Sequence, residues 1–367
     1  MMGKIVEIPF SSSKYEFNEA NFGVVCREIR EFMIVRLKKV NQLQRLTHPN
    51  ERGESGYLWF PFPQSRFDHS IFFLAVAKII LSESGFSEQF VQKFLLTLLT
   101  HDIATPAGGD ATMRLNKQFF CEVKNYRRHM IEAGISMKWR MLYDFDDQEA
   151  ERWVEGFEFA GFLLNVLDRM SYVALDLYHL GKNKPAKILQ LLKKHPLIMD
   201  VWRDICVTKE CVYFSNAYRL YHFLLLRALM HTEFYLNPNC RKLEHIFFSQ
   251  IKKLFDSGEI SVDDLRYKDD QWLESIVRKG KDQSWCTQPE SIDWQCFDNK
   301  EDADAFRAGN NSVFHIEHIK PFETGMHWLV MHRGKIMPLC KALPKQFAVR
   351  IESLSNIREG WYAYYHK

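Results

Sequence analysis

The sequence has 367 residues, 46% of them hydrophobic and 26% charged, and a formal net charge of +3. This length supports one large domain or two ordinary ones, and the near-neutral charge alone gives no argument for a nucleic-acid-binding protein. No apolar run reaches the ~18–20 residues that a membrane span needs, so we expect no membrane partner. The eight cysteines include no Cys-x-x-Cys pair, and reduced thiols in the cytoplasm are the simplest interpretation.

The first part of the chain predicts helices on either side of a long loop. Residues 17–43 carry apolar residues three and four apart, which is typical of a helix. Pro, Gly, Ser and Asn mark residues 48–67 as a loop, with a short extended piece at Tyr57–Phe60. Two apolar helices are predicted next, over 68–85 and 87–102, with Ser87 as a plausible N-cap.

The middle of the chain also predicts helices, whereas the tail has a different pattern. The middle helices are expected over 119–139, 146–181 (with one core helix at 157–180), 186–196, 212–236, 240–256, 261–266 and 269–279. Apolar and polar residues alternate at 314–322 and 327–339, which indicates strands. The sequence therefore predicts a mainly α fold, with a helical domain over 1–280 and a small mixed α/β region of unassigned role over 281–367.

Four residues could form a metal site. His69 lies where the long loop becomes a helix, His101 and Asp102 end the next helix, and Asp168 lies inside the apolar core helix. Two imidazoles and two carboxylates suit one divalent transition metal (Mn, Fe, Ni, Co or Zn), and Mg²⁺ less well, because it prefers oxygen ligands.

The positions of these residues add weight to a shared site. Neighbouring residues on a helix point about 100° apart, so His101 and Asp102 can reach one ion most easily at a helix end. A carboxylate at Asp168, buried among leucines, is costly unless a metal or a basic group neutralises it. Each residue alone has an ordinary structural explanation, and the metal hypothesis depends on their joint appearance.

Three motifs resemble those of the HD-domain metal-dependent phosphohydrolases. Arg66-Phe-x-His69-Ser, then His101-Asp102, then Asp168-Arg-x-x-Tyr172-x-x-x-Asp176 occur in that order. This arrangement is most similar to the deoxynucleoside triphosphate triphosphohydrolase branch. The similarity covers roughly residues 40–280.

The resemblance implies roles for particular residues of this chain. His69, His101, Asp102 and Asp168 match metal ligands, and Arg66 matches a residue that contacts substrate phosphate. Tyr172 and Asp176 match residues that face the sugar and the phosphates. Helix geometry adds His179 as a candidate for substrate binding, because it lies about 20° around the axis from Asp168.

The chain departs from the family after His101-Asp102. The family continues with Gly-His-x-Pro-Phe-x-His, whereas this chain has Thr105 and Asp110 where histidines are expected. The family also uses a second histidine near the leaving group. We expect His129 in that role, 28 residues after His101, with Asp110 as the carboxylate that orients it.

The resemblance implies hydrolysis of a (deoxy)nucleoside triphosphate to a nucleoside and tripolyphosphate, by a homo-oligomer. Three alternatives remain. The substrate could be another nucleotide, such as a monophosphate or a cyclic dinucleotide. The altered loop could mark a nucleotide-binding regulator with a weak site. Basic stretches around 36–45 and 125–130 could bind nucleic acid, although such runs are typical of solvated helix faces.

The tail contains several histidines, but we expect no catalytic role for it. His315 and His318 are three residues apart, and His327 and His332 are five apart. Residues at odd spacings face opposite sides of a strand, so these pairs fit a second metal site poorly.

Overall fold

The computed structural model describes residues 4–7, 14–17, 22–37, 40, 48–49, 55–56, 65–82, 84–180, 184–279 and 292–367. The extended piece expected at Tyr57–Phe60 and the boundary expected at 280/281 lie outside these residues. Within them, no helix is both long enough and apolar enough to cross a membrane. The fold is mainly α with small sheets, as the sequence predicts.

Two short hairpins and two short helices come first in the chain. Strand β1 (Lys4–Glu7) pairs antiparallel with β2 (Lys14–Phe17), and β3 (His48–Pro49) with β4 (Ser55–Gly56). Within the described part of 17–43, where one continuous helix was expected, α2 (Val24–Glu28) and α3 (Phe32–Arg36) are separate helices. Gly23, just before α2, has a φ of 54°, which a continuous helix cannot contain.

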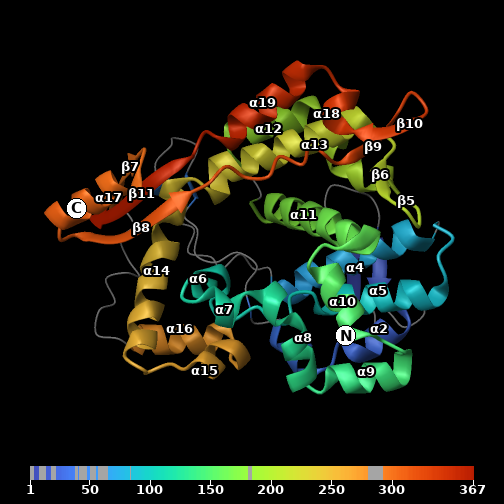
Figure 1. Cartoon of the computed structure of the whole chain (residues 1–367), viewed down its shortest axis with the longest axis horizontal. Helices are drawn as coiled ribbons and strands as arrows, with labels where there is room; N and C mark the ends of the chain where they lie inside the picture. Colours follow the sequence, from blue (N-terminus) through green and yellow to red (C-terminus); the bar gives the residue numbers. More distant parts are fainter. Residues whose placement is uncertain are drawn as a thin grey trace.

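Three helices in the right half of Figure 1 contribute many residues to the main buried core. They are α4 (Arg66–Ser82), α5 (Glu88–Thr100) and α11 (Glu158–Leu180), and α4 packs against both others. The Ser87 hydroxyl caps α5 by accepting the Phe90 N–H, as predicted.

The helices between α5 and α11 are short, and glycines mark two of the breaks between them. They are α6 (Gly109–Met113), α7 (Lys117–Phe120), α8 (Glu122–Glu132), α9 (Ile135–Tyr143) and α10 (Asp147–Val154). Gly134 separates α8 from α9 and Gly156 separates α10 from α11, with φ values of 72° and 89°. A Cβ on Gly161 would come within 2.5 Å of the Gly156 backbone, so glycine allows the close α10–α11 contact.

The next part contains a short sheet that the sequence did not predict. It includes α12 (Ala186–Lys194), the 3₁₀ segment η2 (Pro196–Asp204), β5 (Ile205–Val207), β6 (Val212–Phe214), α13 (Ala217–Met230) and the π-helical η3 (His231–Tyr235). Three further helices follow, namely α14 (Pro238–Asp256), α15 (Val262–Tyr267) and α16 (Asp270–Lys279). The helix expected over 212–236 is therefore wrong at its start. Its first residues pair with β5, and Asn216 caps α13.

The C-terminal region contributes to two sheets. Its elements are β7 (Ile292–Phe297), α17 (Lys300–Gly309), β8 (Val313–Ile319), β9 (Leu329–His332), β10 (Lys335–Pro338), α18 (Leu339–Ala342), α19 (Lys345–Ser355) and β11 (Gly360–His366). Strand β11 lies between β7 and β8, antiparallel to both. Strands β9 and β10 extend the sheet of β5 and β6 in the order β10-β9-β6-β5.

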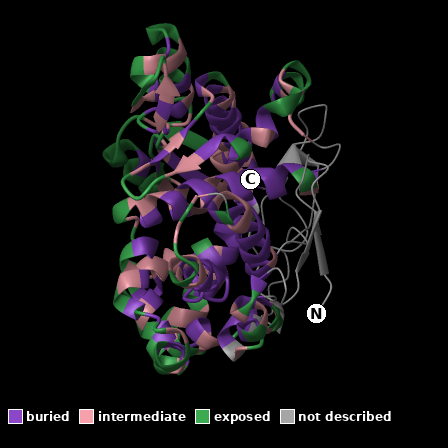
Figure 2. Cartoon of the chain, turned by 90° about the vertical axis from the view of Figure 1, so that its right-hand side faces the viewer, coloured by how far each residue is buried: buried purple, intermediate pink, exposed green. Residues whose placement is uncertain are grey.

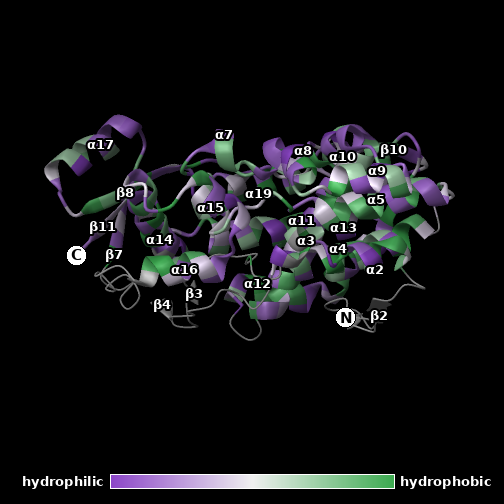
Figure 3. Cartoon of the chain, turned by 90° about the horizontal axis from the view of Figure 1, so that it is seen from below, coloured by the Kyte–Doolittle hydropathy of each residue, from purple (hydrophilic) through white to green (hydrophobic). Residues whose placement is uncertain are grey.

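The two sheets lie in different places (Figure 3). The β7-β11-β8 sheet and α17 form one end of the molecule, and α14 connects this end to the helices. The other sheet packs beside α11 and α13. Buried residues gather on the inner sides of the helices, and exposed residues lie on the outside (Figure 2). The largest buried cluster includes Trp328, Val330 and Ile351, so part of the C-terminal region belongs to the same core as α4, α5 and α11.

Candidate metal centre and cavity

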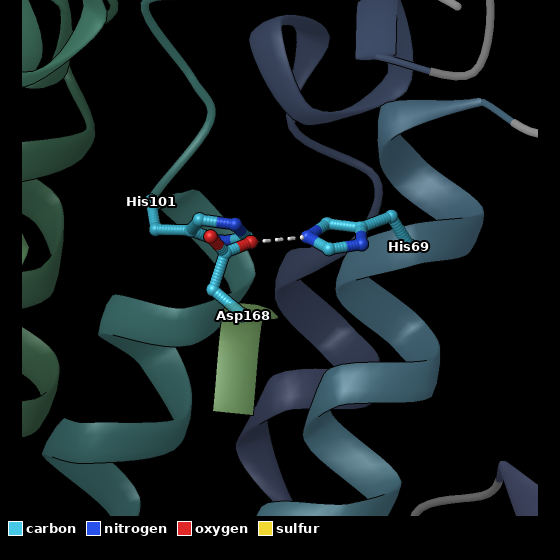
Figure 4. A group of neighbouring side chains, drawn as sticks. All are labelled: His69, His101 and Asp168. Atoms are coloured by element: carbon cyan, nitrogen blue, oxygen red, sulfur yellow. Dashed lines mark hydrogen bonds and ion pairs between the residues drawn. The ribbon is translucent and has the colours of Figure 1, made fainter. Parts of the chain in front are cut away.

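Three central helices bring His69, His101 and Asp168 together. His69 lies in the first turn of α4, His101 ends α5, and Asp168 lies in α11. One ligand atom from each residue lies within 4.8 Å of the others, and Figure 4 shows the three side chains converging from separate helices. Residues that are 99 positions apart, such as His69 and Asp168, are thus neighbours.

His101 is held in the tautomer that a metal ligand needs. Its Nδ1 lies 2.7 Å from the Leu98 carbonyl oxygen, which can only accept a hydrogen bond, so Nδ1 carries the proton. The lone pair of Nε2 is then free. This Nε2 is buried and has no hydrogen-bond partner within the described chain. An imidazole fixed in this way by a backbone carbonyl is typical of metal ligands.

The contact between His69 and Asp168 also points to a cation. The Ser171 hydroxyl donates to the Asp168 carbonyl oxygen and can accept from Nδ1 of His69, at 3.0 and 3.2 Å. With its proton on Nδ1, a neutral His69 directs the lone pair of Nε2 toward the Asp168 carboxylate, 2.9 Å away. Two acceptors in contact need a second proton on His69 or a cation beside them.

Asp102 is anionic and only partly compensated. Burial raises the pKa of the Asp102 carboxyl, but Arg66, His101 and His69 outweigh this effect and lower the pKa to about 2. Its Oδ1 accepts from the Arg66 guanidinium at 3.1 Å. Its Oδ2 lies 3.5 Å from Nε2 of His101 and has no hydrogen-bond partner among the described residues. Two unpartnered buried acceptors therefore face each other, an arrangement that a bound cation would satisfy. A mixed nitrogen and oxygen set of this kind fits a divalent transition metal.

Arg36 of α3 fixes the turn that follows His101-Asp102. Its guanidinium donates to the carbonyl oxygens of Ile103, Thr105 and Lys268, at 3.1, 2.6 and 3.0 Å. The side chain is buried. Because carbonyls in a turn lack helical partners, this arginine stabilises the backbone of the segment that carries the two candidate ligands.

A cavity of about 440 Å³ opens beside the three helices. Seven of the residues proposed from the sequence line it, namely Arg66, His101, Asp102, Asp110, Asp168, Tyr172 and Asp176. His69 is fully buried beside Asp168. The cavity volume is in the range of pockets that bind small organic molecules.

Tyr172 and Asp176 lie along the α11 side of this cavity. The Tyr172 hydroxyl accepts a hydrogen bond from Nε of Arg227 at 2.9 Å. Asp176 accepts from the Tyr235 hydroxyl through Oδ2, and its Oδ1 is buried without a partner within the described chain. Burial raises the pKa of Asp176 to about 7. This carboxyl can therefore donate as well as accept near neutral pH.

Two predicted residues lie away from the cavity. His129 is buried on α8, where its Nδ1 contacts the Asn125 carbonyl oxygen and its ring packs near Tyr267. His179 is at the C-terminal end of α11, where burial lowers its pKa. Neither histidine is among the described residues that line the cavity. The distance of His129 from His101 in sequence did not reveal that this side chain lies outside the cavity lining.

Several cavity residues were missed from the sequence, among them Glu122, Arg114, Arg241 and Glu244. Glu122 begins α8, and its Oε2 accepts from the Thr105 hydroxyl at 2.7 Å and lies 3.9 Å from Arg66. Its place at the start of a predicted helix gave only a weak signal, because acidic residues are common in a first helical turn.

A second group of titratable side chains lies where α14 meets β8. Here His245, His315 and Glu317 place one ligand atom each within 4.8 Å, a grouping that the spacing of the tail histidines did not predict. His315 and Glu317 are two residues apart and therefore share one face of β8. His318, three residues from His315, instead stacks on Trp361.

The hydrogen bonds of this second group favour a polar network over a metal site. Arg114 lies 3.1 Å from Nδ1 of His245, and because a guanidinium only donates, Nδ1 must accept. Nε2 of His245 then carries the proton and donates to Glu317 at 2.9 Å. Glu317 also accepts from Arg241 and Tyr364, at 3.0 and 2.9 Å. The network thus holds Arg114 and Arg241 against the cavity.

Comparison with known proteins gives a similarity of fold. No protein-family model and no curated protein matches the sequence. The chain is similar to the crystal structure of a phosphohydrolase from Bacteroides thetaiotaomicron, with a TM-score of 0.67 and 14% sequence identity. The similarity covers 99% of this chain and 100% of the other.

Proposed function

We propose that this protein is a metal-dependent phosphohydrolase. The observation that carries the proposal is the convergence of His69, His101 and Asp168 beside one cavity. Oδ2 of Asp102 lies 3.5 Å from Nε2 of His101, and both atoms are unpartnered among the described residues. Arg66 lies on the same wall. The similarity in fold to a phosphohydrolase supports the same class of reaction.

The roles follow from the chemistry of each group. His69, His101, Asp102 and Asp168 would hold one divalent transition metal, which when bound supplies a Lewis acid to water and phosphate oxygens. Arg66 would bind phosphate oxygens through a planar fork of N–H donors. Its hydrogen bond to Asp102 leaves other N–H groups for a ligand, because the side chain offers five.

The substrate that we propose is a (deoxy)nucleoside triphosphate, cleaved to a nucleoside and tripolyphosphate. The cavity volume accommodates a molecule of this size. Tyr172 and Asp176 offer hydroxyl and carboxyl groups that suit the hydroxyls of a sugar. Tyr235 and Leu236, on the same lining, offer an aromatic and an apolar surface for a base.

The test is a metal analysis followed by product identification. The purified protein should contain one transition metal per chain, and His101→Ala and Asp168→Ala should each lose it. Wild type should convert a mixture of deoxynucleoside triphosphates to nucleosides and tripolyphosphate. Full metal occupancy in both variants would overturn the site.

The panel should also include nucleoside monophosphates and cyclic dinucleotides. Phosphate release from a monophosphate, or ring opening of a cyclic dinucleotide, without cleavage of any triphosphate would keep the proposed reaction class but replace the proposed substrate. Metal binding without turnover on the whole panel would favour a nucleotide-binding regulator, for which the altered segment from Thr105 to Asp110 is the motive.

A further inference from the structure

We propose that Glu122 is the proton donor to the leaving oxygen in this reaction, in the place where the sequence suggested His129. The inference rests on the proposed function and names a further catalytic residue for it. Breaking a phosphorus–oxygen bond to a nucleoside leaves an alkoxide, which is a poor leaving group unless an acid protonates it. Such an acid must reach the cavity that holds the substrate.

The position of Glu122 at the cavity favours it as the proton donor over His129 and Asp110, the two catalytic residues expected from the sequence. Glu122 lines the cavity, whereas His129 is not among the described residues that do so. The side chain of Asp110 also lines the cavity but is 63% exposed, so water can hydrate its charge. The Glu122 side chain is 24% exposed and lies 3.9 Å from Arg66, the proposed phosphate ligand. A phosphate on Arg66 would therefore lie within reach of the Glu122 carboxyl.

The surroundings of Glu122 favour a carboxyl that keeps its proton near neutral pH. Burial raises the pKa of Glu122 to about 7, and the negative charges of Asp102 and Asp110 act in the same direction. Arg66 and the Thr105 hydroxyl act in the opposite direction. These groups come from α4, the turn after α5, and α6. Oε2 accepts from Thr105 at 2.7 Å, which orients the carboxyl.

The proton balance of the step is simple. The oxygen of a water molecule forms a bond to phosphorus, and the bond from phosphorus to the leaving oxygen breaks. The leaving oxygen keeps the electron pair and takes the proton of the Glu122 carboxyl. The attacking water gives its proton to solvent, and the Glu122 carboxylate takes one back from solvent. No oxidant or reductant is needed.

The key variant is Glu122→Gln, which retains an oxygen that accepts from Thr105 but has no acidic proton. Its substrates are an active nucleoside triphosphate and the 5′-thio analogue, in which sulfur replaces the bridging oxygen. We expect a loss of about 10² to 10³ in kcat on the oxygen substrate, as for other general acids. The loss on the analogue should be below about tenfold, because a thiolate leaves without a proton.

Three further variants separate this role from others. Glu132→Gln, at the far end of α8 and outside the cavity lining, should retain wild-type kinetics. His129→Gln tests the residue suggested by sequence, and a leaving-group-dependent loss there would overturn the proposal. Asp176→Asn removes the other carboxyl whose pKa is raised to about 7, and should affect both substrates equally.

Infrared spectroscopy of the metal-loaded protein gives a readout that does not need turnover. Wild type should show a protonated carboxyl near neutral pH that is absent from Glu122→Gln, with metal content and Tm unchanged. A Glu122 that is ionised throughout this range would overturn the proposal. So would equal losses on both substrates, or an unchanged Glu122→Gln in an active enzyme. A wild type without turnover on any nucleotide would instead refute the proposed function itself.

Discussion

At the scale of single residues, Arg66 lies between the candidate metal ligands and the open cavity. It is the first residue of α4, and its guanidinium donates to Asp102 while lying 3.8 Å from Asp110 and 3.9 Å from Glu122. Three carboxyl groups therefore surround one buried guanidinium. Burial alone would lower the pKa of Arg66, but the nearby charge of Asp102 above all holds it above its ordinary value. An arginine held in this way is fixed before a ligand arrives.

Arg66→Lys should lose most activity while retaining the metal. A lysine keeps the charge but cannot donate in a fork to both Asp102 and a phosphate. We expect a cost of roughly 2–4 kcal/mol in the barrier, or about 10² to 10³ in kcat/KM. Steady-state kinetics and metal analysis measure both properties. The matched control is Arg128→Lys, an exposed arginine that pairs with Glu132. Equal kinetics in the two variants would remove Arg66 from the mechanism.

Asp176 should make stability depend on pH. Its pKa is about 7 in the folded chain, because of burial, against about 3.9 for an unfolded aspartate. A carboxyl whose pKa is raised on folding stabilises the folded protein fully at pH values below its pKa in the unfolded state. That contribution to the free energy of unfolding is lost as the pH rises through about 7. Between about pH 5 and pH 8 the free energy of unfolding of metal-free wild type should fall more than that of Asp176→Asn. Denaturant titrations at both pH values measure this free energy. Equal changes in wild type and in the Asp176→Asn variant would contradict the prediction.

At the scale of elements, the turn after α5 depends on a helix much earlier in the chain. Arg36 of α3 supplies hydrogen bonds to the carbonyls of Ile103 and Thr105, and so fixes the backbone that follows the two candidate ligands. Nothing in the sequence near His101-Asp102 indicates this partner, because the contact joins residues 67 and 69 positions apart.

Arg36→Met should weaken metal binding without removing any ligand. Methionine fills much of the same space but leaves buried carbonyls without donors, at a cost of about 1–3 kcal/mol each. We expect a lower free energy of unfolding and a higher Kd for the metal, measured by denaturant and by metal titration. The exposed Arg30→Met on the same segment serves as the control. An Arg36 variant with wild-type metal affinity would show that the turn is fixed by other contacts.

At the scale of the whole molecule, part of the C-terminal region belongs to the main core. Trp328 is 1% exposed and stacks on Phe214 of β6, with ring centroids 5.8 Å apart. The Arg169 guanidinium lies 5.6 Å from its ring, and Arg169 follows Asp168 directly in α11. A residue beyond the expected boundary at 280/281 therefore packs next to the metal-ligand helix. The boundary and the homo-oligomer stay predictions.

Trp328→Ala should destabilise the whole chain. Removal of a buried tryptophan typically costs about 3–5 kcal/mol. We expect a clearly lower Tm, together with weaker metal retention, because Arg169 loses its ring contact beside Asp168. The comparison is Trp361→Ala in the β7-β11-β8 sheet, where the ring is only partly buried and stacks on His318. A Trp328 variant as stable as the Trp361 variant would mean that the region folds independently.

Local sequence patterns were sufficient to predict several of the helices. Helix periodicity predicted α4, α5 and α11, and the sequence predicted Ser87 as the cap of α5. The motifs identified the residues that converge at the metal centre. Sequence patterns did not predict β5 and β6, because three-residue strands carry too little periodicity and are specified by pairing with distant strands. Glu122 and the network of His245 and Glu317 depend on tertiary contacts in the same way.

The network of Arg241, Glu317 and Tyr364 connects the C-terminal strands to the cavity. The candidate metal ligands all precede residue 180, whereas this part of the cavity wall depends on β8 and β11. A molecule that binds both Arg66 and Arg241 would therefore connect two segments that are far apart in the sequence. Its binding should slow the exchange of amide hydrogens in β8 and β11, although the candidate metal ligands lie on helices from the first half of the chain.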